Sequence, residues 1–146
     1  MSSLHHIGLT VGDLERSVDF YRGLLGCEVI DKVESHGSEM AVITGVEGVR
    51  LRAADLRLPG GETLELIQYL HPAGKHLVQH SYEAGHTHIG FRVDDAHAAH
   101  ERLLEIGGVA RSSPVQLSSP GSIWDAAWVF YALDPDGRTI ELVQVG

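Results

Sequence analysis

The stretch at residues 5–26, HHIGLTVGDLERSVDFYRGLLG, aligns without a gap with residues 87–108, THIGFRVDDAHAAHERLLEIGG. Both copies contain His-Ile-Gly, a Val three residues later, an Asp and a closing Gly. A second block repeats in the same order, since residues 58–69, LPGGETLELIQY, match residues 134–145, DPDGRTIELVQV. The chain is therefore predicted to be one module of ~75 to 80 residues used twice.

Hydrophobic periodicity predicts the same order of elements in each half. Ile7, Leu9 and Val11 alternate with small or polar residues, which indicates a half-buried strand. Asp13 then stands at a helix N-cap position, and the helical pattern stops at Gly26. Three further alternating stretches follow in each half. The expected strands are residues 4–11, 28–34, 49–58, 63–69, 86–93, 109–117, 126–133 and 139–145, and the expected helices are residues 14–25 and 96–106.

These elements predict an α+β fold made of two tandem βαβββ modules with curved mixed sheets. Module 1 is expected at residues 1–70, a linker containing Pro and Gly at 71–86, and module 2 at 87–146. Together they are expected to form one domain spanning residues 1–146. Each curved sheet would form half of a cup, and two such halves facing each other would enclose a ligand.

Composition excludes several classes of function. The 146 residues are 43% hydrophobic and 21% charged, as in a globular domain, and no apolar run approaches a membrane span. Acidic residues outnumber basic ones by 20 to 11, and the basic ones are scattered, so neither nucleic acid nor a membrane is an expected partner. The first residues do not resemble a secretory signal, which favours a cytoplasmic location. The single cysteine, Cys27, excludes an internal disulfide and a thiolate zinc cage.

Two histidines and two glutamates are selected from the composition by the repeat and by strand phase. His6 and His88 occupy the same place in the two modules, on the face opposite the apolar residues of their strands. Glu65 and Glu141 are equivalent in the second block, and their apolar neighbours again leave them on the face of the histidines. The other eight of the ten histidines have no counterpart in the repeat.

Two imidazoles and two carboxylates form a suitable ligand set for one divalent ion of the Ni, Zn, Co, Mn or Fe type. The carboxylates offset the charge of the ion, and open coordination positions remain for water or substrate. We therefore expect one metal ion bound by His6, Glu65, His88 and Glu141. The alternative is that duplication left these residues in place without a function.

The strand and helix signature His6-Ile7-Gly8-Leu9-Thr10-Val11, with Asp13-Leu14, Ser17, Phe20-Tyr21 and Leu25-Gly26, resembles the vicinal oxygen chelate superfamily. This superfamily includes glyoxalase I, methylmalonyl-CoA epimerase, extradiol dioxygenases and bleomycin-resistance proteins. The second-half motifs at residues 88–91 and 134–142 resemble it too, so the resemblance covers nearly the whole chain. It implies the same four metal ligands, and homodimers with metal sites shared across the interface are common among such relatives. The sequence does not choose between a shared site and an intrachain one.

The resemblance implies a metal-dependent lyase or isomerase of the glyoxalase I or epimerase type. Such an enzyme moves a proton in a small carbonyl or vicinal-oxygen substrate through a metal-stabilised enediolate, with Glu65 or Glu141 as the catalytic proton carrier. One alternative is a non-catalytic small-molecule-binding protein of the bleomycin-resistance type, and another is an extradiol-type dioxygenase. Residues that would recognise glutathione are not evident, so turnover of a glutathione substrate is expected to be weak or absent.

Three further residues are candidates for substrate binding. Arg92 is in phase with His88, which places it on the expected ligand face, where it suits an anionic group. Tyr69 and Trp128 are aromatic residues that would line an apolar wall beside the metal, or else pack in the core.

Overall fold

The computed structural model describes residues 1–78 and 80–146. The chain divides into two compact units, Met1–His76 and Leu77–Gly146, and the boundary lies inside the segment predicted as a linker. Each unit has its own mixed sheet and a helix packed on it, which confirms the predicted α+β class. Residue 79 of the expected linker lies outside the described residues. Among the described residues, no helix has the length and apolar character needed to cross a bilayer.

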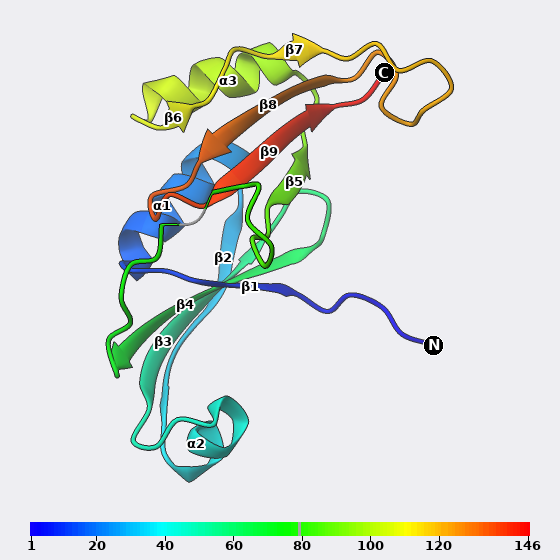
Figure 1. The fold of residues 1–146 in the computed structure, drawn as a ribbon. Helices are drawn as coiled ribbons and strands as arrows, with labels where there is room; N and C mark the ends of the chain where they lie inside the picture. The colour runs from blue at the N-terminus through cyan, green and yellow to red at the C-terminus, as the bar shows by residue number, and fades with distance from the viewer. Residues whose placement is uncertain (79) are drawn as a thin grey trace. The chain divides into compact units, whose positions relative to one another are not determined.

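The first unit contains a four-stranded sheet in the order β1-β4-β3-β2 (Figure 1). β1 runs parallel to β4, and the other neighbours are antiparallel. The elements are β1 Ile7–Thr10, α1 Leu14–Leu25, β2 Glu28–His36, α2 Ser38–Thr44, β3 Arg50–Arg57 and β4 Thr63–His71.

The second unit repeats this topology with the path β5-β9-β8-β6, and β7 also pairs with β8 (Figure 1). β5 is parallel to β9, as β1 is to β4. The elements are β5 Ile89–Arg92, α3 Ala96–Glu105, β6 Val109–Ala110, β7 Val115–Gln116, β8 Trp128–Leu133 and β9 Thr139–Gln144.

The first helix of each unit begins and packs as the sequence predicts. The side chain of Asp13 accepts a hydrogen bond from Arg16 N, and that of Asp95 accepts from the backbone of His97 and Ala98. α1 ends at Gly26, whose φ of 70° is left-handed and suits glycine. α1 packs on β3 and β4, and α3 packs on β6, β8 and β9. The buried residues of α1 are Leu14, Ser17, Val18, Tyr21 and Leu24.

The glutamine repeated in the second block ties each sheet to its helix. Gln68 Oε1 of β4 accepts a hydrogen bond of 3.0 Å from Leu14 N, the first amide of α1. Gln144 Oε1 of β9 accepts one of 2.9 Å from Ala96 N, the first amide of α3. These side chains satisfy amide groups that a helix N-terminus leaves without a partner. The repeated glutamine therefore has a structural role.

The strands β1 and β5 begin three residues later than expected, at Ile7 and Ile89, and two further segments differ in kind from the expected elements. Residues 38–44, expected as a loop, form helix α2, which begins and ends at glycines with positive φ, Gly37 and Gly45 (Figure 1). Met40 and Ala41 of α2 pack on the buried cluster of Val49, Leu51 and Ala53. The strand expected at 109–117 is divided into β6 and β7, since Pro114 lies between them and has no amide hydrogen for a ladder.

The buried thiol of Cys27 gives a prediction about pH. Cys27 is 5% exposed, and burial raises the pKa of its thiol from 9.0 to about 11. The unfolded chain loses this proton at lower pH than the folded chain, so stability is fully present below about pH 9 and declines between about pH 9 and 11. We expect a disulfide reagent at about pH 8 to modify the native thiol much more slowly than the thiol of the urea-unfolded chain. Equal rates in the two states would contradict the burial.

Candidate metal centre

In the first unit, the parallel pairing of β1 with β4 brings His6 to Glu65. Gly8 is the register partner of Glu65, and His6 lies two residues before this glycine. The Nε2 atom of His6 is 3.3 Å from Oε2 of Glu65, and the side chains are 42% and 28% exposed. The pair is therefore open to solvent and to a ligand, and we call it the His6–Glu65 pair.

The second unit contains the equivalent arrangement. Gly90 is the register partner of Glu141, and His88 lies two residues before it. The Nε2 atom of His88 is 3.5 Å from Oε2 of Glu141, with exposures of 42% and 13%. The repeat thus preserves a three-dimensional arrangement as well as the identity of the residues. We call this the His88–Glu141 pair.

The repeated glycine in each first strand provides the space for the carboxylate. A Cβ atom on Gly8 would lie 3.4 Å from Oε2 of Glu65, and one on Gly90 would lie 3.3 Å from Oε2 of Glu141. A Cβ would stand at van der Waals distance from the Glu65 oxygen and slightly closer to the Glu141 oxygen, so each glycine leaves room for the carboxylate beside its strand. These two glycines therefore belong to the site, beyond the roles in turns and caps that other glycines have.

The spacing within each pair fits a divalent metal ion. Metal–nitrogen and metal–oxygen bonds are about 2.0–2.2 Å long, so two ligand atoms that share an ion at ordinary angles are about 3.0–3.5 Å apart. The separations of 3.3 and 3.5 Å are in this range. In the described part of the chain, no three or more His, Cys, Asp or Glu side chains gather as a metal site, so each unit presents two ligands.

The cross-strand neighbours of the two glutamates differ between the units. Asp55 of β3 is the register partner of Glu65, whereas Tyr131 of β8 is the register partner of Glu141. The ring of Tyr131 also contacts the ring of His88, with centroids 5.4 Å apart. The sequence analysis did not select Asp55, because only strand register shows that it neighbours Glu65. The surroundings of the first pair are therefore acidic and those of the second aromatic.

The three candidate substrate residues lie in different places. Arg92 is exposed and shares a face of β5 with Gly90, beside the His88–Glu141 pair. Tyr69 is on the same face of β4 as Glu65 and packs against the cluster that contains Leu51. Trp128 does not line the ligand face. Trp128 lies three positions from Tyr131, so its side chain is on the opposite face of β8, towards the helix. The centroid of its ring is 4.8 Å from that of His97 of α3.

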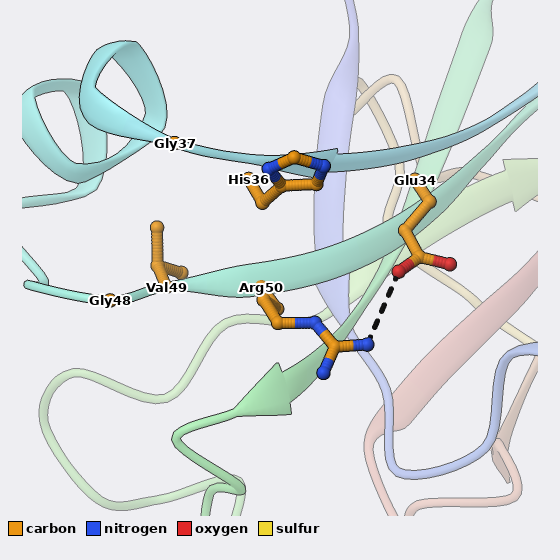
Figure 2. Close-up of a pocket in the computed structure, with 6 residues that line it drawn as sticks. All are labelled: Glu34, His36, Gly37, Gly48, Val49 and Arg50. Carbon is orange, nitrogen blue, oxygen red and sulfur yellow. Dashed lines mark hydrogen bonds and ion pairs between the residues drawn. The ribbon is translucent and has the colours of Figure 1, made fainter.

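A separate cavity of about 480 Å³ lies at the end of β2 and β3 (Figure 2). Glu34 and Arg50 both line this cavity and form an ion pair with an N–O distance of 3.4 Å, drawn as a dashed line in Figure 2. His36, on the same strand as Glu34, is a third lining residue. Val49, which is 1% exposed, forms an apolar part of the wall. Neither His6 nor Glu65 is among the described lining residues, so the cavity and the metal candidates are different places on the first unit.

The chain belongs to the glyoxalase/bleomycin resistance protein/dioxygenase superfamily, whose family model matches residues 3–142. This confirms the resemblance seen in the sequence motifs. The chain is 29% identical to a 2-epi-5-epi-valiolone epimerase from an Actinomyces species, over 98% of this chain and 79% of that protein. It is 28% identical to a lactoylglutathione lyase from Haemophilus influenzae, over 95% of this chain and 90% of that protein.

Solved structures show the same fold. A glyoxalase family protein from Bacillus cereus superposes with a TM-score of 0.85 at 18% identity, covering 99% of this chain and 95% of that one. A glyoxalase/bleomycin resistance protein/dioxygenase domain from a Frankia species gives a TM-score of 0.71 at 21% identity, covering 100% and 93%.

Proposed function

We propose that this protein is a metal-dependent lyase or isomerase that moves a proton in a small substrate carrying a carbonyl group. His6, Glu65, His88 and Glu141 hold one divalent ion, of the Ni, Zn, Co, Mn or Fe type. The observation that carries the proposal is the equivalent geometry of the two His–Glu pairs, at 3.3 and 3.5 Å, each with its carboxylate over a glycine. Each pair offers half of a four-ligand set.

The chemistry follows from the types of ligand. A bound divalent ion supplies the positive charge that stabilises the oxyanion formed when a C–H bond next to the carbonyl is broken. Glu65 or Glu141 supplies the base: its carboxylate takes the proton from one carbon and returns it to the same or a neighbouring carbon. Return to the same carbon on the other face is an epimerisation, and return to a neighbouring carbon is an isomerisation. Arg92, exposed beside the second pair, supports recognition of an anionic or strongly polar substrate group.

The names of two relatives, an epimerase and a lyase, support the two types of proton transfer described above. The epimerase from Actinomyces and the lactoylglutathione lyase from Haemophilus both align over nearly the whole of this chain. We favour a substrate that does not contain glutathione, because residues that would bind the thiol cofactor are not apparent in the sequence. The protein is proposed to act as a homodimer.

Metal-dependent proton exchange is the experiment that tests the proposal. Untagged protein is freed of metal and then loaded with Ni²⁺, Zn²⁺, Co²⁺, Mn²⁺ or Fe²⁺. It is incubated in D₂O with the ketone 2-epi-5-epi-valiolone, named in the Actinomyces relative, or with the hemithioacetal of methylglyoxal and glutathione. We expect deuterium to enter the carbon next to the carbonyl of the ketone, detected by proton NMR, in the loaded protein only. The same protein after chelation is the matched control.

Three outcomes distinguish the alternatives. Less than about 0.2 equivalents of metal bound after incubation with all five ions would overturn the proposal. Tight binding of the ketone without exchange would favour a small-molecule-binding protein. Oxygen consumption with a catechol in the Fe²⁺-loaded protein would favour a dioxygenase.

A further inference from the structure

His5, which has no counterpart in the repeat, is hydrogen-bonded to a proposed metal ligand. Its Nδ1 atom is 2.8 Å from Nδ1 of His6, and the two rings meet edge to face, with centroids 5.1 Å apart and planes at 84°. The other ring nitrogen of His6, Nε2, faces Glu65 at 3.3 Å. Both nitrogens of His6 are therefore engaged, one by His5 and the other by Glu65.

The number of protons shared by His5 and His6 determines which of the two imidazoles donates the hydrogen bond between them. A hydrogen bond between two Nδ1 atoms contains one proton, and a neutral imidazole has one proton in total. When His6 donates this proton, its Nε2 carries a lone pair that faces a carboxylate, which is also an acceptor. Two facing acceptors are stabilised by a cation between them. When His6 accepts, its Nε2–H is free to donate to Glu65.

Metal binding through Nε2 requires the first of these two arrangements. His5 can accept in that arrangement because its own proton then resides on its Nε2, on an exposed ring. The same imidazole can donate when no metal is bound, so the exchange of roles needs no movement of heavy atoms. Thr87 stands at the corresponding position of the second unit, so this imidazole pair belongs to the first unit.

We infer that His5 is a positioning residue: it accepts the Nδ1 proton of His6 and so presents Nε2 of His6 to the metal ion. The inference rests on the proposed function, since it needs a metal at the His6–Glu65 pair. Partners of this kind fix the tautomer and the ring orientation of metal-binding histidines, and their loss typically weakens metal binding 10- to 100-fold. His5 is exposed, so its removal takes little packing away from the fold.

The experiment measures Zn²⁺ binding by the untagged full chain, by competition with a chromophoric chelator. His5→Ala is expected to raise the Zn²⁺ Kd by about 10- to 100-fold. His5→Asn places an amide oxygen near the position of Nδ1, so its Kd is expected to stay within about threefold of the wild type. The matched control is His36→Ala, which removes an exposed histidine elsewhere on the first unit and should leave the Kd unchanged.

Nitrogen NMR gives a second readout that a merely structural role would not move. In the Zn²⁺-loaded wild type, the ¹⁵N spectrum of His6 should show a protonated Nδ1 and a metal-bound Nε2. An Nδ1-bound metal, or a Kd for His5→Ala equal to that of the wild type, would overturn the inference and leave the proposed function standing. A wild-type chain that binds none of the five ions of the proposed function would overturn both. Circular dichroism of each variant checks folding, and the wild-type spectrum provides the test if His5→Ala does not fold.

Discussion

The double variant Glu65→Gln/Glu141→Gln is expected to lose proton exchange by about 10⁴-fold or more. General base catalysis contributes about 10²–10⁴-fold for one group, and this variant removes both carboxylates beside the proposed metal. Gln keeps a neutral oxygen as a weak metal ligand but cannot take a proton. Deuterium exchange by the metal-loaded variant is the measurement, and metal content is determined on the same sample.

The single variants then identify the base. The glutamate whose Gln variant retains metal and loses exchange is the proton carrier. Glu105→Gln is the matched control, because Glu105 is exposed on α3, away from the ligand face, and full activity is expected. Exchange at the wild-type rate in the double variant would remove both carboxylates from the mechanism.

The same assay shows how the ligands are shared between chains. His6→Ala and His88→Ala are each expected to be inactive alone. In a homodimer whose metal sites combine the first unit of one chain with the second unit of the other, a mixed dimer retains one intact site. Random mixing then restores about one quarter of wild-type activity, whereas sites formed within single chains give no restoration.

The second large effect is expected on stability. Asp134→Ala should lower the free energy of unfolding by about 3 kcal/mol. The buried carboxylate accepts hydrogen bonds from the backbone of the β8–β9 turn, and its removal leaves these donors and Arg138 without that partner. Asp134 is 5% exposed and accepts hydrogen bonds from Asp136 N at 3.0 Å and from Arg138 N at 2.8 Å. It also forms an ion pair of 2.8 Å with the Arg138 guanidinium. Urea unfolding monitored by circular dichroism measures the loss.

The conservative variant Asp134→Asn separates the contribution of the backbone hydrogen bonds from that of the ion pair. Asp134→Asn keeps an acceptor for the two backbone amides and loses the charge, so a smaller loss of about 1 kcal/mol is expected. The corresponding residue of the first unit is Leu58, which shows that the turn can form without a carboxylate when its surroundings differ. A change within about 0.5 kcal/mol of wild type for Asp134→Ala would show that the turn does not depend on this residue.

Much of the fold could be predicted because the same pattern occurs in both modules, so each half supports the elements assigned in the other. The helix cap at Asp13 and the end of the helix at Gly26 follow from local chemistry, and the structure confirms them. Helix α2 could not be predicted, because its seven residues are too short for a clear period. The division of the expected strand at 109–117 has a local signal that the alternation obscured, because Pro114 cannot donate a ladder hydrogen bond, although both pieces still pair with β8.

In the candidate site too, some residues could be selected from the sequence pattern, whereas others are revealed only by the pairing of strands. Phase and repetition were enough to select His6, Glu65, His88 and Glu141, whose assignment as metal ligands stays a prediction. Asp55 and Tyr131 are neighbours of the glutamates only through the register of antiparallel strands. For Trp128 the sequence leaves both the ligand wall and the core open, and the alternation of β8 places its ring against α3.

The strands β4 and β9 each combine two duties within four residues. In β4, Glu65 faces the ligand side, and three residues later Gln68 faces the helix and accepts its first amide hydrogen. In β9, Glu141 and Gln144 repeat this spacing. Residues on the ligand face of the strand can therefore be substituted, and the reaction changed, while the glutamine on the other face still holds the N-terminus of the helix against the sheet. This separation of duties gives a physical reason why a single architecture can host lyases, epimerases and binding proteins through exchanges on one side of a strand.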